Sequence, residues 1–119
     1  MRFETFDVGG VTVAELVEGE IASERDAIDL VGSASFQGAD VVLVESHKLA
    51  PDFFDLSTGL AGAALQKFSN YRLRLVIAGE FEGHGSESLQ AFIRESNRGG
   101  NVAFVADRET ALARIAQQG

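Results

Sequence analysis

The sequence predicts an α/β fold, with a mixed and mostly parallel sheet in a single domain that spans residues 1–119. Short apolar runs of the kind that form buried strands alternate with segments in which apolar residues recur at helical spacing. A Gly-Gly pair near the N-terminus separates two such runs and marks a leading hairpin, which adds an antiparallel strand. The 119 residues contain no internal repeat and no Pro-rich linker, as expected for one domain.

The leading hairpin is predicted from strands at residues 2–8 and 11–17, on either side of Gly9-Gly10. A tight two-residue turn needs positive φ angles, which glycine adopts at little steric cost. The second of these strands is apolar at nearly every position on both of its faces. We therefore expect a sheet that is covered on both sides.

The middle of the chain predicts a helix, a strand and a second helix. Residues 23–26, Ser-Glu-Arg-Asp, resemble a capping box, and a helical pattern of apolar residues follows them. The apolar run at residues 41–44 predicts a central strand, because it is short and rich in valine. Residues 45–56 are expected to form a loop, and the second helix begins after Ser57-Thr58.

The rest of the chain continues the alternation. Its predicted elements are a strand at residues 73–78, a helix from Ser86 or Ser88 to about residue 97, a strand at residues 102–105, and a helix capped by Asp107 that ends near residue 116. The whole order is β-β-α-β-α-β-α-β-α, which gives about four helices. Right-handed crossovers then make the later strands parallel.

Composition and charge exclude several classes of function. The formal net charge is −8, and lysine and arginine do not cluster as phosphate-backbone binding requires, so we expect no nucleic-acid partner. No apolar run approaches the roughly 18–20 residues that would span a bilayer. The N-terminus lacks the apolar stretch of a signal peptide. We therefore expect no membrane partner and a cytoplasmic location. The chain has no cysteine and therefore cannot form a disulfide.

No recognised catalytic motif is present, and we expect a protein that is not an enzyme, without catalytic residues, metal or cofactor. The two histidines, His47 and His84, fall in predicted loops and lack the spacing of known metal ligands. One catalytic alternative stays open. His47 begins the loop that ends at Ser57, so a base and a nucleophile could meet there.

The order of elements and three motifs resemble the STAS domain, named for sulphate transporters and anti-sigma-factor antagonists. The resemblance lies in residues 10–17 with Gly19-Glu20-Ile21, in the central run 41–44, and in Ser57-Thr58-Gly59-Leu60 with the strand that follows at 73–79. A closer resemblance is to an uncharacterised bacterial family of STAS-like proteins. It lies in residues 53–62, 65–72 and 94–99.

The resemblance implies a regulatory protein-binding module similar to anti-sigma-factor antagonists. In those proteins the first hydroxyl residue of the loop before the second helix accepts phosphate, and by position that residue is Ser57. The acidic residue that precedes it in the family falls here on Leu56, with Asp55 one step earlier. The partner loop would comprise Phe54, Asp55, Leu56, Ser57, Thr58 and Gly59.

Other interpretations remain open. Ser57 and Thr58 can serve only to cap the helix. The second function class is a small-molecule or anion-binding domain, with a pocket at the carboxyl ends of the strands, near Val44–Lys48, Ser57 and Gly79–His84. Of Phe53-Phe54, either both are buried or one lies at the surface as a protein contact. The hairpin edge and the small-sided helix that contains Gly62 offer surfaces for a homodimer.

Overall fold

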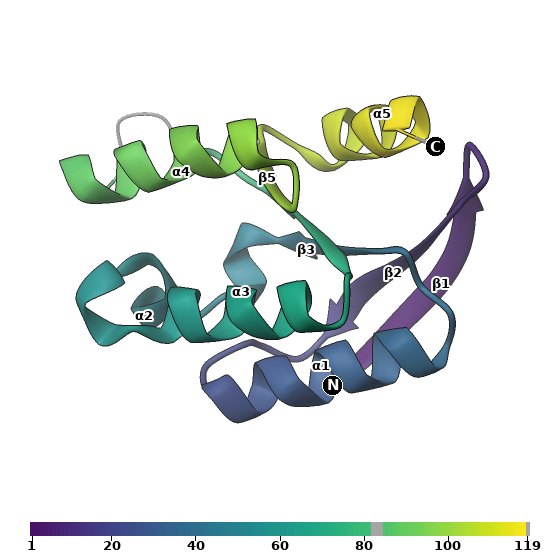
Figure 1. Ribbon diagram of the computed structural model, residues 1–119, viewed down its shortest axis with the longest axis horizontal. Helices are drawn as coiled ribbons and strands as arrows, with labels where there is room; N and C mark the ends of the chain where they lie inside the picture. Colours follow the sequence, from purple (N-terminus) through teal and green to yellow (C-terminus); the bar gives the residue numbers. More distant parts are fainter. Residues whose placement is uncertain (82–84, 119) are drawn as a thin grey trace.

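A computed structural model describes residues 1–81 and 85–118 and shows one five-stranded sheet (Figure 1). The strands lie side by side in chain order: β1 (Arg2–Val8), β2 (Val11–Glu18), β3 (Val41–Glu45), β4 (Arg74–Ala78) and β5 (Val102–Val105). β1 pairs antiparallel with β2, and every later pair is parallel. The predicted α/β class, the leading hairpin and the mostly parallel sheet are confirmed.

Five α-helices lie in the described part of the chain: α1 (Glu24–Phe36), α2 (Pro51–Phe54), α3 (Leu60–Asn70), α4 (Glu87–Gly99) and α5 (Arg108–Gln118). Four of them were predicted. The fifth, α2, is a single turn inside the segment that was expected to be a loop, and short 3-10 helices precede and follow it at Ser46–Lys48 and Leu56–Thr58. No helix among the described residues is both long enough and apolar enough to cross a membrane.

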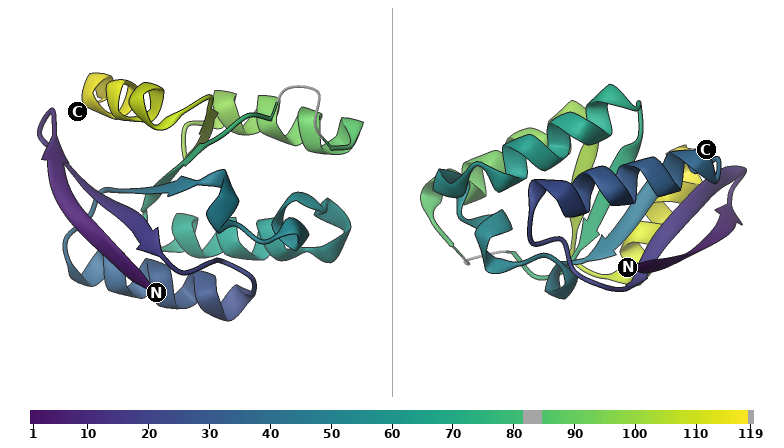
Figure 2. Two further views of the ribbon diagram at one scale, coloured as in Figure 1. Left: turned by 180° about the vertical axis from the view of Figure 1, so that it is seen from behind. Right: turned by 90° about the horizontal axis from the view of Figure 1, so that it is seen from below.

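The helices cover both faces of the sheet. The strands β2 to β5 advance in one direction, so right-handed crossovers place the connecting helices α1, α3 and α4 on one face. These helices share one apolar core, whereas α5 packs in a second core on the opposite face. The right-hand view of Figure 2 shows α1 and α3 side by side in front of the strands, with α5 behind them. The expected two-sided cover of the sheet is confirmed.

One charged side chain is buried in this sheet. Glu15 of β2 is only 8% exposed, and its carboxylate accepts two hydrogen bonds of 2.8 Å from the guanidinium of Arg108, at the start of α5. This paired geometry satisfies both carboxylate oxygens, so the acid can face the second core. The pKa of Arg108 is raised by the hydrogen bonds and charge of Glu15.

The helix starts follow the predicted caps. Ser23 accepts a hydrogen bond from the backbone N–H of Asp26, and Ser86 accepts one from Leu89, which selects Ser86 over the alternative Ser88. Asp107 accepts one from the N–H of Thr110. Each side chain satisfies one N–H of a first helical turn, which has no partner within the helix.

Helix α4 also closes the outer edge of the sheet. The side-chain amide of Asn97 accepts a hydrogen bond from the backbone N–H of Phe104 in β5 (2.7 Å) and donates one to the carbonyl of the same residue (3.3 Å). The amide thus bonds to β5 as a neighbouring strand would. Asn97 had been predicted only as the approximate end of this helix.

Candidate functional site

A groove of about 490 Å³ opens at the carboxyl edge of the sheet, where β3 and β4 end. We call it the carboxyl-edge groove. Its apolar lining is Pro51, Phe54, Leu56, Phe81 and Leu89. The other described residues that line it are Ser46, His47, Asp55, Glu80, Gly85 and Ser86.

The groove lies here because of how the two central strands end. After β3 the chain turns into a 3-10 helix at Ser46–Lys48, and after β4 it passes through Gly79. A Cβ atom on Gly79 would lie 2.6 Å from the Cβ of Ser46 and would also overlap the Ser46 hydroxyl. Glycine is therefore needed for the two strand ends to come this close, which brings Ser46 and Glu80, the residues beside this contact, into one groove.

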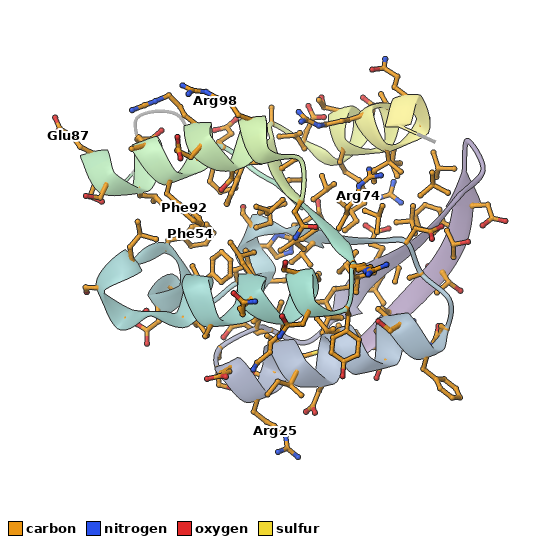
Figure 3. The ribbon with its side chains drawn as sticks, in the orientation of Figure 1. Arg25, Phe54, Arg74, Glu87, Phe92 and Arg98 are labelled. Atoms are coloured by element: carbon orange, nitrogen blue, oxygen red, sulfur yellow. The ribbon has the colours of Figure 1, made fainter. Side chains whose placement is uncertain are left out.

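Phenylalanine side chains form the walls. The rings of Phe54 and Phe81 have centroids 5.8 Å apart, and Phe81 makes an edge contact with Phe104 at 5.2 Å. Figure 3 shows Phe54 and Phe92 pointing into the space between α3 and α4. Phe53 is 2% exposed. The structure thus separates the Phe53-Phe54 pair: the first belongs to the core and the second to the groove.

Asp55 organises the loop at the rim of the groove. Its carboxylate accepts hydrogen bonds from the backbone N–H of Ser57 (3.1 Å) and from the Ser57 hydroxyl (2.6 Å). Hydrogen bonds favour the ionised form, so they lower the pKa of Asp55 below its usual value. The Ser57 proton is therefore directed to a carboxylate of its own loop, and not to His47.

Thr58, rather than Ser57, supports the start of α3. Its hydroxyl oxygen accepts a hydrogen bond from the N–H of Leu60 at 3.2 Å, and the hydroxyl can donate to the carbonyl of Asp52 (2.7 Å) or of Asp55 (2.9 Å). Gly59 follows with a φ of +79°, in the left-handed region. The capping interpretation thus holds for Thr58, while Ser57 is left exposed on the surface.

The predicted partner loop is only partly a lining of the groove. Phe54, Asp55 and Leu56 line it, whereas Ser57, Thr58 and Gly59 are exposed beside it. The alternative prediction was a pocket near residues 44–48, Ser57 and residues 79–84; of these, Ser46, His47, Glu80 and Phe81 line the groove, and Ser57 does not. His84, which belonged to that prediction, lies outside the described residues.

Pro51, Ser86 and Leu89 were not predicted as site residues. Ser86 was expected to cap its helix and does so, and Leu89 is buried on the same helix; both also line the groove. Pro51 belongs to α2, which the sequence did not predict. Within the described residues, no three His, Asp or Glu side chains lie close enough together to hold a metal ion.

Glu80 and Phe81 separate the carboxyl-edge groove from a second hollow. This second hollow measures about 560 Å³ and reaches Asn97 and Ala106 at the end of β5. The side-chain amide of Gln90 donates a hydrogen bond to the carbonyl of Phe81, which ties the dividing segment to α4.

Comparison with known proteins identifies a family. A family model described as "Domain of unknown function (DUF4180)" matches residues 9–115. No curated protein matches the chain, and no solved structure does. The expected membership of an uncharacterised family is confirmed, while the resemblance to the STAS domain stays a prediction. The chain belongs to the DUF4180 family.

Proposed function

We propose that this chain is a non-catalytic binding domain and that the carboxyl-edge groove receives a small organic molecule. The observation that carries the proposal is the groove itself. Its volume of about 490 Å³ falls in the usual range of roughly 300–1,000 Å³ for ligand pockets. Apolar side chains with a few polar groups line it, and it lies at the carboxyl ends of parallel strands, where α/β folds commonly bind ligands.

The proposal is tested by native mass spectrometry of the purified protein, combined with a thermal-shift screen of small molecules. We expect a bound mass, or a compound that raises the melting temperature, in the wild type. The Phe54→Ala variant should show neither the bound mass nor the rise in melting temperature, because it removes one wall of the groove. Phe36→Ala is the matched control, since Phe36 is 92% exposed on α1. No bound mass and no stabilising compound, with circular dichroism confirming a folded protein, would overturn the proposal.

A second candidate function is a regulated protein-docking module, as the resemblance to the STAS domain implies. The observation that favours it is the position of Ser57, which is exposed and bonded to the groove residue Asp55. A phosphate on this hydroxyl would remove its donated hydrogen bond and place a charge of about −1.5 to −2 beside an ionised carboxylate. The resulting repulsion would change the partner loop, residues 54–59.

This candidate is tested by affinity capture with the wild type and with Ser57→Asp. The wild type should retain a specific partner that Ser57→Asp loses. Ser33→Asp is the control, because it adds the same charge at an exposed position on α1. A partner held equally by all three proteins would rule out the switch.

A further inference from the structure

The charges around the carboxyl-edge groove are mainly negative. Two carboxylates, Asp55 and Glu80, line it, and none of its described lining residues is a lysine or an arginine. Arg94 is not a lining residue of the groove; it lines an adjacent hollow that shares Gly85 and Ser86 with it.

Both carboxylates are able to interact with a ligand. Asp55 is exposed, and its bonds from Ser57 favour the ionised form. Glu80 is also exposed and has no ion-pair partner among the described residues. The rim of the groove therefore carries two carboxylates that form no ion pair with a described side chain, and the one histidine among its described lining residues is His47.

The walls add a second preference. Cations are attracted to aromatic rings within about 6 Å of the ring centroid. Phe54 and Phe81 have centroids 5.8 Å apart, so a cation held against this pair can lie within that range of both rings. Leu56 and Leu89 extend the apolar surface beside them.

We propose that the groove selects an amphipathic organic cation, namely an amine with an alkyl or aryl body. The ammonium group lies at the rim, near Asp55 and Glu80 and against the rings of Phe54 and Phe81, and the apolar body packs on Leu56 and Leu89. This inference rests on the proposed function of the groove as a small-molecule site and adds the chemical class of the ligand. A carboxylate of the same shape is repelled by the rim.

Three matched probes test the inference: 2-phenylethylamine, 2-phenylethanol and 3-phenylpropionate, each titrated into the protein labelled with nitrogen-15 and followed by NMR. We expect the amine to bind about tenfold more tightly than the carboxylate, with the alcohol between them, because the rim attracts one charge and repels the other. The amide signals of Ser46, Asp55 and Phe81 should shift. Added salt should weaken binding of the amine but not binding of the alcohol, because it screens charges.

Glu80→Gln provides the decisive variant, since it removes the charge and keeps the shape. The substitution should weaken binding of the amine about two- to fivefold, which is the range of a solvent-exposed ion pair, and should leave the affinity for the alcohol unchanged. Glu87→Gln is the control, because Glu87 does not line the groove and points away from the molecule in Figure 3. Asp55 is not substituted, because it also holds Ser57 in place.

The outcomes separate the two proposals. Binding of the carboxylate as tightly as the amine, or an unchanged amine affinity in Glu80→Gln, would overturn the cation inference but leave a ligand-binding groove. Signal shifts confined to other parts of the protein, or no binding of any probe at millimolar concentration, would count against the groove as the ligand site as well.

Discussion

The close approach of Gly79 to Ser46 makes a quantitative prediction for the variant Gly79→Ala. The new Cβ would lie 2.6 Å from the Cβ of Ser46, whereas ordinary contact begins at 3.4 Å. The ends of β3 and β4 would therefore have to separate by about 0.8 Å. Because Gly79 does not have a positive φ, the backbone itself accepts alanine, and any loss of stability reports the steric overlap.

Overpacking of this kind costs about 1–3 kcal/mol in the free energy of unfolding. For a chain of this size, such a loss lowers the melting temperature by roughly 4–12 °C. The companion change Ser46→Gly removes the Cβ and should restore most of the loss, with a coupling free energy of about 1–2 kcal/mol. Ser46→Ala should restore little, since the Cβ that causes the overlap remains.

Urea unfolding of the two single variants and the double variant measures this coupling. Gly62→Ala is the control: nothing lies within 4 Å of a Cβ at this exposed position in α3, so it should stabilise the protein by about 0.5–1 kcal/mol. If Gly79→Ala were as stable as the wild type, or if Ser46→Ala rescued it as well as Ser46→Gly, the packing argument for the close approach of the two strand ends would be wrong.

Three further predictions concern the rest of the fold. Arg108→Ala leaves the buried Glu15 carboxylate unpaired and should lower the free energy of unfolding, measured in urea, by about 1–3 kcal/mol. The control Arg98→Ala, at an exposed position, should change the same free energy by less than about 0.5 kcal/mol. The hydrogen bonds from Thr110 lower the pKa of Asp107 in the folded protein below its value of about 3.8 in the unfolded chain. The ionised Asp107 therefore stabilises the fold above pH 3.8, and this stabilisation is lost as the pH falls through the pKa of the folded state. Thermal unfolding from about pH 5 to 2 should therefore show a smaller acid-induced loss in Asp107→Asn, and an unchanged loss would contradict this assignment. Asn97→Leu leaves the N–H and carbonyl of Phe104 without their partner and should cost about 1–3 kcal/mol, while Asn97→Gln, if its longer amide reaches β5, should cost less.

The fold was predictable because its long elements carry clear periodic patterns. The second strand is apolar on both faces and is covered on both faces, and the caps at Ser23 and Asp107 begin helices as expected. Helix α2 was missed because four residues are too few to show a helical period. Gly62, on the helix that the sequence shows to be small-sided, is exposed, with open space around it. Small size alone does not show which way a helix face points.

The groove was only partly predictable. The carboxyl ends of parallel strands identified the segments near His47 and Glu80, because strand order places such ends together. Local pattern could not show that Pro51 and Leu89 would meet them, since these residues come from separate helices. Nor could it distinguish the roles of Ser57 and Thr58, because that choice depends on which hydroxyl Asp55 binds.

The amide of Asn97 limits how other molecules can join this protein. An unpaired strand edge can accept an extended peptide as an additional strand, which is a common mode of peptide recognition. At Phe104 in β5, both backbone groups already have a partner within the chain. At the opposite edge, the exposed charges of Arg2, Glu4 and Asp7 and the register shift between Arg2 and Phe3 disfavour the same association. Growth of the sheet from one molecule to the next is therefore opposed at both ends, by the Asn97 amide at one edge and by charge and irregular register at the other.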